Sequence, residues 1–354
     1  MGERKLRIAI SGAKHGKWHA REIRRLERDL GLCELVAVCR ATNGPSADFY
    51  DPMREEGLPS AAVPFFTNYA NMLKEMAPDA VIITSPNRFH YDQAMRALEA
   101  RCHVYLEKPS AWDPEDSLKQ NEEAGEQLFT SAEASGMLLC GGTQLTTWFD
   151  RPGSGFYSIA PKLPESEIRM FEMQVGTASA KAGEELLVDM LPHAYGVLWK
   201  IAGTGSLAFD VPLHGQSDAF VQERQHSMIV RASYRRAEHK PVEMSLVLDA
   251  EYGRRFLGFA VNGIAARREV TNRPYTLWLA NRTAREEVPD PLRLALFGFV
   301  AELAAPTFGR RLEKLAELRD AHAMLCDTLD AYRGRSVQDL SLSRSLSAAI
   351  LQSS

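Results

Sequence analysis

The sequence lacks the features that mark several large classes of protein. No stretch approaches the run of about 18 apolar residues that a membrane-spanning helix needs. The N-terminal segment MGERKLRIAI has no long apolar core before charged residues return, so we expect no signal peptide. The formal net charge of -4 provides no cationic surface for nucleic acid. We therefore expect a cytoplasmic protein that binds neither membranes nor nucleic acid.

Cysteine is also scarce. The five cysteines, an odd number, show no C-x-x-C spacing, and each lies in or beside an apolar run. This usage favours buried thiols in a reducing compartment over disulfides or a zinc site. The histidines likewise show no metal-ligand spacing, so we predict no metal site.

The composition is otherwise that of an ordinary folded protein, with 45% hydrophobic and 25% charged residues. A chain of 354 residues is long enough for two domains. We place a first domain at 1–142, a second at 143–335 and a serine-rich tail at 336–354. Basic runs such as REIRR at 21–25 are expected to form solvated helix faces.

Short apolar runs alternate with helical patterns over the first 142 residues. Strands are expected at 6–10, 33–40, 79–85, 102–109 and 137–142. Helices are expected between them at 16–30, 69–76, 90–101 and 116–136. Because parallel strands need crossover helices, this alternation predicts an α/β fold with a doubly wound parallel sheet of the Rossmann type.

The pattern changes after residue 143. Strand-like segments follow at 167–175, 226–236 and 242–253. Asn262-Gly263, between two further strand-like arms, is typical of a type I′ hairpin. A helix is expected from about Asp189 to Lys200, and the chain then ends its second domain with helices at 292–304 and 312–335. These segments predict an α+β domain with a mostly antiparallel open sheet, with the option that the terminal helices pack back on the first domain.

The turn after the first strand reads SGAKHG. A strand that enters a glycine turn and opens a helix is where dinucleotide-binding proteins hold the pyrophosphate, with the fingerprint G-x-G-x-x-G. Here Ser11 and Ala13 replace the first two glycines, and only Gly16 is kept. Gly12 still provides a flexible turn, the helix N-terminus favours anions, and Lys14 adds a positive charge. We expect a working but reshaped phosphate-binding turn.

Arg40 ends the second expected strand. At this place in the fold an acidic residue meets the ribose hydroxyls of NAD, whereas an arginine suits the 2′-phosphate of NADP. Arg40, which is followed by Thr42 and Asn43, therefore favours NADP slightly over NAD.

Two further strand ends carry polar residues, TSPNRFH from Thr84 to His90 and LEKPS from Leu106 to Ser110. Their order and spacing resemble the Gfo/Idh/MocA family of oxidoreductases, in which a strand ending in T-P-N-x-x-H precedes a helix and a strand ending in E-K-P. The family fingerprint G-x-G-x-x-G-x-x-H-A also aligns with residues 11–20, and its D-x-x-x-H motif aligns with Asp189 and His193.

The resemblance implies which residues would bind a nicotinamide dinucleotide. The implied cofactor contacts are Ser11, Gly12, Ala13, Lys14, His15, Gly16, Arg40, Thr84, Ser85, Pro86, Asn87, His90, Glu107 and Lys108.

The resemblance also implies the chemistry. His193 would take the proton of a substrate hydroxyl, Lys108 would stabilise the developing alkoxide, and Asp189 would orient and balance one of them. The i, i+4 spacing puts Asp189 and His193 on one helix face, and Pro192 fits only if the helix begins near Asp189. Gln144, after the fifth strand, is expected to contact substrate together with Lys108 and His193.

We expect from the resemblance an NAD(P)-dependent oxidoreductase that acts on a hydroxyl or carbonyl of a small molecule such as a sugar, amino sugar or cyclitol. One alternative is reduction of a C=N bond, or a redox-neutral reaction with retained cofactor, which the unusual stretch at 141–157 and Pro192 favour. Another is a dinucleotide-binding protein without catalysis, which the two missing glycines favour.

Trp148, Tyr157 and Trp199 are candidates for a pocket wall, although aromatic side chains more often belong to a core. The open sheet favours a homo-oligomer, either a dimer or a tetramer.

Overall fold

The computed structural model describes residues 4–40, 47–59, 63–150, 153, 155–177, 181–209, 221–224, 227–250, 256–272 and 275–334. They form two compact units, which we describe separately. The first comprises Met1–Gln144 and Leu292–His322, and the second comprises Leu145–Pro291 and Ala323–Ser354. The helical residues 292–322, which we predicted in a second domain with the option of packing back on the first, are grouped with the first unit. The predicted tail lies outside the described residues.

The first unit is built on a six-stranded sheet in which all neighbouring strands are parallel. Its strands are β1 (Leu6–Ser11), β2 (Cys33–Cys39), β3 (Phe65–Phe66), β4 (Ala80–Ile83), β5 (His103–Glu107) and β6 (Leu139–Gly142). Their order, β3-β2-β1-β4-β5-β6, reverses direction between β1 and β4, where such folds bind ligands beyond the carboxyl ends of the strands. The predicted doubly wound sheet is confirmed. Only β3 was missed, because two residues are too few to show a pattern.

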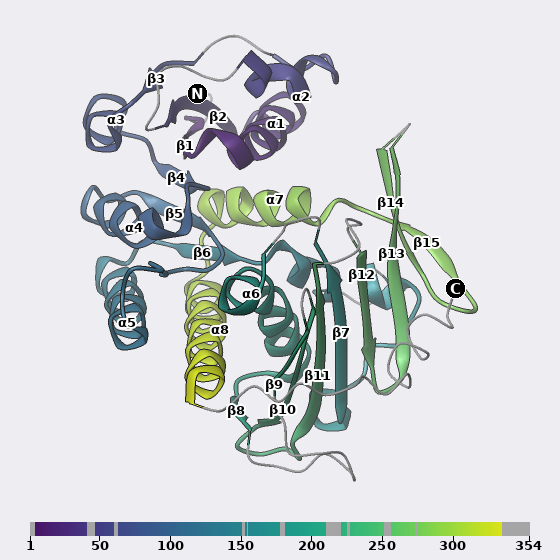
Figure 1. Cartoon of the computed structure of the whole chain (residues 1–354). Helices are drawn as coiled ribbons and strands as arrows, with labels where there is room; N and C mark the ends of the chain where they lie inside the picture. Colours follow the sequence, from purple (N-terminus) through teal and green to yellow (C-terminus); the bar gives the residue numbers. More distant parts are fainter. Residues whose placement is uncertain are drawn as a thin grey trace. The chain divides into compact units, whose positions relative to one another are not determined.

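Helices cover both faces of this sheet (Figure 1). The helices are α1 (Ala13–Leu30), α2 (Asp51–Arg54), α3 (Tyr69–Met76), α4 (His90–Glu99), α5 (Leu118–Ser135), α7 (Pro291–Ala304) and α8 (Phe308–Gly334), with the 3-10 turns η1 (Ala47–Tyr50) and η2 (Asn87–Phe89). The core on one face joins the sheet to α1, α2 and α7. The core on the other face joins it to α3, α4, α5 and the start of α8. Burial on both faces explains why the strands are almost entirely apolar.

The ends of α5 follow from local sequence. The Ser117 hydroxyl accepts the backbone N–H of Gln120, and the Gln120 side chain reaches back to the Ser117 backbone, which forms a capping box. Gly136 ends the helix in the left-handed conformation.

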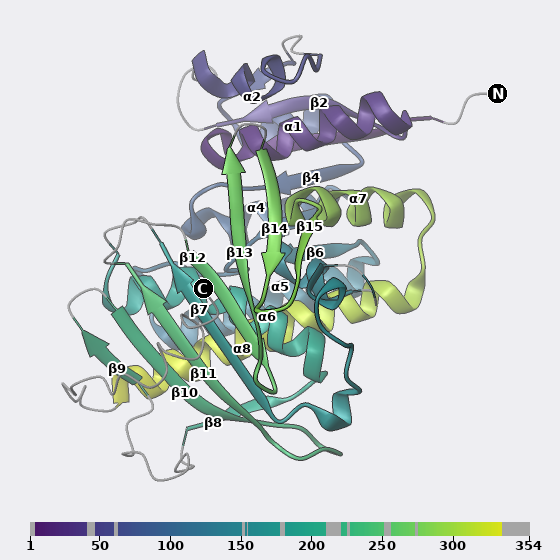
Figure 2. The same cartoon turned by 90° about the vertical axis from the view of Figure 1, so that its right-hand side faces the viewer.

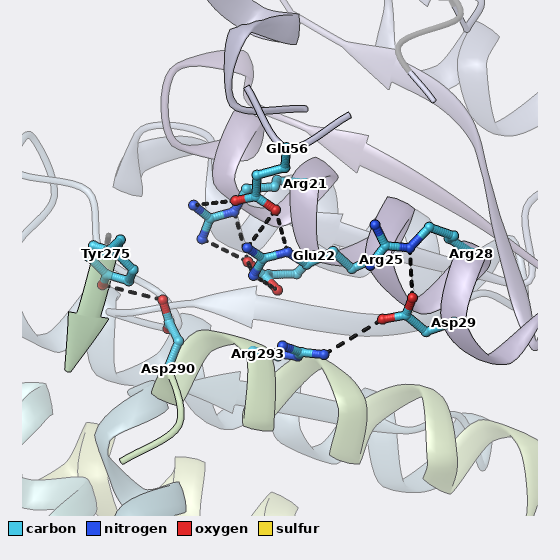
Figure 3. Close-up of polar contacts among 9 residues, drawn as sticks. All are labelled: Arg21, Glu22, Arg25, Arg28, Asp29, Glu56, Tyr275, Asp290 and Arg293. Atoms are coloured by element: carbon cyan, nitrogen blue, oxygen red, sulfur yellow. Dashed lines mark hydrogen bonds and ion pairs between the residues drawn. The ribbon is translucent and has the colours of Figure 1, made fainter. Parts of the chain in front are cut away.

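The arginines of REIRR are held by acidic side chains, as Figure 3 shows for two of them. Glu22 on α1 is fully buried, and its carboxylate lies 2.7 Å from the guanidinium of Arg21 and 2.8 Å from that of Arg25. Both arginines also contact Glu56 after α2. Arg24 pairs with Glu27 at 2.6 Å. The basic run therefore binds α1 to the segment after α2 and does not form the fully solvated face that we expected.

The second unit contains a nine-stranded sheet, most of whose strands are visible side by side in Figure 2. Its strands are β7 (Met170–Gly176), β8 (Ser206–Ala208), β9 (Val221–Arg224), β10 (Ser227–Arg235), β11 (Val242–Asp249), β12 (Phe256–Val261), β13 (Ile264–Asn272), β14 (Tyr275–Ala280) and β15 (Arg285–Val288). All neighbours are antiparallel except β7 and β11, so the predicted mostly antiparallel sheet is confirmed. The short strands β8, β9 and β15, together with β14, were not predicted.

The predicted hairpin turn is confirmed at Asn262-Gly263. It joins β12 to β13, and both residues have positive φ, 48° and 80°, as a type I′ turn requires. The Asn262 side-chain oxygen also accepts the backbone N–H groups of Arg169 and Met170, at 2.8 and 3.0 Å, so the turn also holds the start of β7.

The helix of the second unit, α6 (Gly183–Ala202), packs against β7 and β11. Its predicted start near Asp189 is wrong, because α6 begins six residues earlier, at Gly183. Pro192 therefore lies inside the helix and not in its first turn, and the carbonyl of Val188 cannot receive the usual N–H from it. Burial of most of the helix surface outweighs this loss, since the sequence LLVDMLPHAYGVLWKIA is apolar on nearly all sides.

The unusual stretch at 141–157 belongs largely to the core of the second unit. It forms the 3-10 turns η3 (Gln144–Phe149) and η4 (Gly155–Ser158), and η5 (Glu165–Glu167) follows before β7. Trp148 is fully buried, and its indole N–H donates to the Pro289 carbonyl at 3.0 Å. Trp199 is also buried. Neither tryptophan is an exposed pocket wall.

All five cysteines are buried free thiols, as predicted. Over the described ranges, no helix is both long enough and apolar enough to cross a membrane.

Replacing Gly125 by alanine should destabilise the first unit. A Cβ at Gly125 on α5 would lie 2.2 Å from the His322 imidazole on α8, whose Nε2 lies 3.1 Å from the Asn121 carbonyl oxygen. Because His322 is buried, it cannot move without losing this contact, and overpacking of this kind costs about 1–3 kcal/mol. Chemical denaturation measures the loss. Gly298→Ala in α7 is the matched control, since its Cβ meets nothing within 4 Å and alanine should preserve or raise stability. Equal stability of the two variants would contradict the packing argument.

Candidate active site

The β1–α1 turn lies in backbone contact with the end of β4. Gly12 has φ 98°, and a Cβ there would lie 2.4 Å from the carbonyl carbon of Thr84 and 2.5 Å from the nitrogen of Ser85. Its N–H donates to the Cys39 carbonyl of β2 at 2.9 Å. Only glycine fits this position, so the residue between the two missing fingerprint glycines has become the conformationally essential one.

The Thr84 hydroxyl fixes the turn from the other side. It lies within hydrogen-bond distance of two backbone carbonyl oxygens to which it can donate, that of Ser11 at 3.0 Å and that of Gly12 at 2.7 Å. The Thr84 N–H also donates to the Ser11 carbonyl, at 2.7 Å. Thr84 is buried, so its side chain holds the β1–α1 turn and has little surface for the expected cofactor contact.

The side chains that replace the two glycines do not stand in front of the α1 N-terminus. Ser11 and Ala13 are each only 2% exposed, and the Ala13 methyl belongs to the core beneath α1. Gly12 gives α1 no side-chain cap, and its first turn carries no acidic residue. Lys14 and His15 are exposed there. Uncapped N–H groups, an adjacent lysine and a first turn without acidic residues are the donor set that a pyrophosphate needs, so the residues present fit the group.

Gly16 keeps the role of the last fingerprint glycine. A Cβ there would lie 2.8 Å from Cγ2 of Ile10 and 3.1 Å from the Thr84 hydroxyl. Because Gly16 has no side chain, α1 can pack closely on β1.

The β4–α4 turn contains Ser85, Pro86 and Asn87, of which Pro86 is exposed and the other two are half-buried. His90 closes this turn from inside. Its Nε2 lies 2.8 Å from the Ser85 carbonyl and its Nδ1 lies 2.7 Å from the Pro109 carbonyl. Burial lowers the pKa of His90, and the two carbonyl contacts oppose that shift. With 1% of its surface exposed, His90 connects the β4 and β5 ends, and we assign it a positioning role in place of the expected cofactor contact.

The β5 end brings Glu107 and Lys108 to the same edge. The Glu107 carboxylate lies 3.0 Å from Nε2 of the buried His19, the histidine of the fingerprint. Desolvation lowers the pKa of His15; the charge of Glu107 opposes that shift, and the charges of Lys14 and Lys108 add to it. The contact between His19 and Glu107 therefore joins the start of α1 to the end of β5.

Arg40 and Gln144 lie at the ends of β2 and β6 of the first unit. Both are half-buried, and the Arg40 N–H donates to the Phe66 carbonyl at 2.9 Å. Thr42 and Asn43 lie outside the described residues.

The second unit holds the other part of the predicted set. Asp189 and His193 both lie in α6, so the i, i+4 spacing holds, and both are half-buried. The Asp189 carboxylate lies 2.8 Å from the ammonium of Lys181, which precedes the helix. Sequence reasoning missed Lys181, because no motif marks it. Its only signal is a lysine two residues before the helix-opening Gly183.

A separate cavity of about 440 Å³ lies in the second unit. Its lining includes Tyr157, Lys162, Glu165, Lys200 and His239, so Tyr157 does line a pocket, and Lys108, Asp189 and His193 do not belong to the lining of this cavity. Burial raises the pKa of Tyr157 to about 12, and the Glu165 carboxylate acts in the same direction. Within the part of the chain that the structure describes, no group of three or more His, Cys, Asp and Glu side chains is placed to hold a metal ion.

The strand order and the helices on both faces of the sheet define the first unit as a Rossmann-type unit. Residues 6–130 match the family model described as the oxidoreductase family with an NAD-binding Rossmann fold, GFO_IDH_MocA. The match covers about a third of the chain, and it is to the Gfo/Idh/MocA family that the joined strand-end motifs also resemble.

Individual relatives resemble the chain to different extents. The D-glucoside 3-dehydrogenase of Escherichia coli K12 is 40% identical over 114 residues, which are 32% of this chain and 29% of that protein. The match therefore spans less than a third of that relative. A dehydrogenase structure from Chromobacterium violaceum has a TM-score of 0.65 at 16% identity and covers 94% of this chain and 97% of that one. A 3-ketoreductase from Actinomadura kijaniata, in complex with TDP-benzene and NADP, has a TM-score of 0.59 at 17% identity over 90% and 96% of the two chains. At these identities the two structures show the fold alone.

Thr84→Val should loosen the β1–α1 turn. Valine keeps the shape of threonine but removes the hydroxyl that serves the carbonyls of Ser11 and Gly12, and loss of a buried hydrogen bond costs about 1–2 kcal/mol. Urea denaturation should show this loss. Thr130→Val, at an exposed position of α5 in the same unit, should change stability by less than about 0.5 kcal/mol. If the two variants unfold at the same denaturant concentration, the hydroxyl does not hold the turn.

Proposed function

We propose that the protein is an NAD(P)-dependent oxidoreductase that transfers a hydride between nicotinamide and a hydroxyl or carbonyl carbon of a sugar-type small molecule. The single observation that carries the proposal is the edge of the first sheet. There, an uncapped helix N-terminus and Lys14 follow β1 and the Glu107-Lys108 motif ends β5, in a chain whose residues 6–130 match an oxidoreductase family model. The sugar-type substrate is supported by the relative that is a D-glucoside 3-dehydrogenase.

The first unit would hold the cofactor. The N–H groups at the start of α1 and the Lys14 ammonium would meet the pyrophosphate, and the β4–α4 turn would contact the remainder of the dinucleotide. Arg40 would meet the 2′-phosphate, which is why we propose NADP over NAD. A bound nicotinamide would supply or accept the hydride.

Side chains of the protein would carry out the proton transfer. The His193 imidazole would take the hydroxyl proton, because histidine is the side chain whose ordinary pKa lies nearest neutrality. The Lys108 ammonium would donate a hydrogen bond to the same substrate oxygen and stabilise its negative charge. In the reverse direction, His193 would return the proton to the carbonyl oxygen as it becomes a hydroxyl.

Lys181 adds a second positive charge to this set. The Lys181 ammonium lies 2.8 Å from the Asp189 carboxylate. Asp189 lies one helical turn before His193 in α6. Asp189 would therefore be fixed in place before substrate arrives, which favours its role in orienting His193 over a role as a mobile base.

Non-catalytic dinucleotide binding has less support than oxidoreductase activity. It rested on the loss of two glycines, but the Ala13 methyl belongs to the core and the buried Ser11 hydroxyl is bonded to Gln93, so neither side chain blocks the helix end. We further propose a cytoplasmic location, which the buried free thiols suit, and a homo-oligomer.

Lys108→Ala should lower kcat by about 100-fold or more, because the substrate oxygen would lose the donor that stabilises its charge. The measurement is NAD(P)H absorbance during turnover of a panel of glucosides, amino sugars and cyclitols. Lys119→Ala, a lysine with an 82% exposed side chain on α5, is the matched control and should leave kcat unchanged. An unchanged kcat for Lys108→Ala on a true substrate would overturn the catalytic assignment.

Arg40→Ala should weaken NADPH binding by about 10-fold or more and NADH binding by less than twofold, since a charge-assisted hydrogen bond is worth about 1.5–3 kcal/mol. Fluorescence titration of both cofactors measures the two affinities. Arg96→Ala, which removes an exposed arginine paired with Asp92 on α4, should affect neither. Equal affinity of the unaltered protein for NADPH and NADH would remove the basis for an NADP preference.

A further inference from the structure

Two serine hydroxyls from neighbouring strand ends share one acceptor. Ser11 ends β1 and Ser85 follows β4, and each hydroxyl donates to the side-chain oxygen of Gln93 on α4 at 2.9 Å. An amide oxygen has two lone pairs, so a single glutamine can serve both hydroxyls. Gln93 thereby links the β1–α1 turn to the β4–α4 turn.

The alternation of side chains along the strands explains why both serines reach the same helix. Ala9 on β1 and Ile83 on β4 belong to the core on the α4 side of the sheet. Two residues further along each strand, Ser11 and Ser85 continue on that side. Thr84 points to the opposite side, where its hydroxyl lies close to the position of Gly16 beneath α1. Thr84 and Gln93 therefore hold the two turns together from opposite faces.

We propose that Gln93 is a positioning residue for the dinucleotide cradle. It keeps the Ser11 side chain on the α4 face, away from the open N-terminus of α1, and fixes the separation of the two turns that the cofactor would contact. A serine at the first fingerprint position is tolerated because this acceptor is present. The inference rests on the proposed function, since it assigns Gln93 to the same cofactor site.

Loss of the acceptor has a defined local cost. Ser11 is 2% exposed, so its hydroxyl has little access to water in place of Gln93. Without the amide oxygen, the turns lose the connection on the α4 face and keep the Thr84 hydroxyl on the α1 face. A cradle that is free to adopt more arrangements binds its ligand more weakly, because ordering it then costs binding free energy.

The test uses the full chain and two probes, NADPH and NADH, titrated by fluorescence. Gln93→Leu removes the acceptor and keeps the bulk of the side chain. Gln127→Leu is the matched control, because the Gln127 oxygen on α5 accepts the Tyr91 hydroxyl at 2.6 Å, outside the two turns. Thermal unfolding of each variant is recorded alongside. If Gln93→Leu does not fold, Gln93→Ala takes its place, since alanine suits any helix interior.

Gln93→Leu is expected to weaken binding of the preferred dinucleotide by about threefold to tenfold, the effect of one or two hydrogen bonds. Gln127→Leu is expected to change it by less than twofold. The same Gln93→Leu exchange, made in a Ser11→Ala and Ser85→Ala background, should also change affinity by less than twofold, because the hydroxyls through which Gln93 acts are gone. A merely structural glutamine would have the same effect in both backgrounds.

Unaltered affinity in Gln93→Leu, while the parent protein binds NADPH or NADH, would overturn the positioning role and leave the proposed function intact. An equal loss of affinity in both backgrounds would also overturn it. If the parent protein binds neither dinucleotide, the proposed function fails, and the inference about Gln93 fails with it.

Discussion

The close approach of two backbones, at Gly12 and at the end of β4, is the constraint on which the cofactor edge depends. A single methyl group at Gly12 would collide with the Thr84–Ser85 peptide. Because the turn lies so close, one threonine hydroxyl can bond two of its carbonyls, and the Ser11 side chain can reach α4. The helix end is left open to an anion. A fingerprint that keeps one of three glycines can therefore still build the cradle, since the essential positive φ has moved to the residue between the exchanged positions.

The second unit uses burial in a different way. Helix α6 accepts a proline in its interior because its apolar surface is enclosed by β7, β11 and their neighbours, and this burial outweighs one missing backbone hydrogen bond. The same helix carries Asp189 and His193 on its less buried side, and an ion pair with Lys181 satisfies the carboxylate. Rigid packing of the helix thus serves the precision of the polar pair, since side chains on a fixed helix need little reordering.

The doubly wound sheet, the strand-end motifs and the Asn262-Gly263 turn could all be predicted, because each depends on residues close together in the chain. The two-residue strand β3 and the short strands β8, β9 and β15 could not, because they are strands only through their neighbours in the sheet. The wrong start of α6 has the same origin. Local propensity places Pro192 in a first turn, whereas burial of the preceding residues extends the helix to Gly183. REIRR was read as a solvated face because Glu56 is remote in sequence from Arg21 and Arg25.

The sequence by itself determined the fold class of both units, the sheet edge at which we propose the cofactor site and the residue types available for it. Hydrophobic periodicity and motif spacing are local properties, and they survive without coordinates. Only the tertiary structure decided what the individual side chains do there. The Ala13 methyl packs in the core, the Ser11 hydroxyl bonds Gln93, and His90 contacts two backbone carbonyls. Glu107 pairs with His19, and Lys181 pairs with Asp189. These assignments depend on contacts between residues that are distant in the chain or on opposite faces of a strand, and their energies come from burial and geometry that no local pattern encodes.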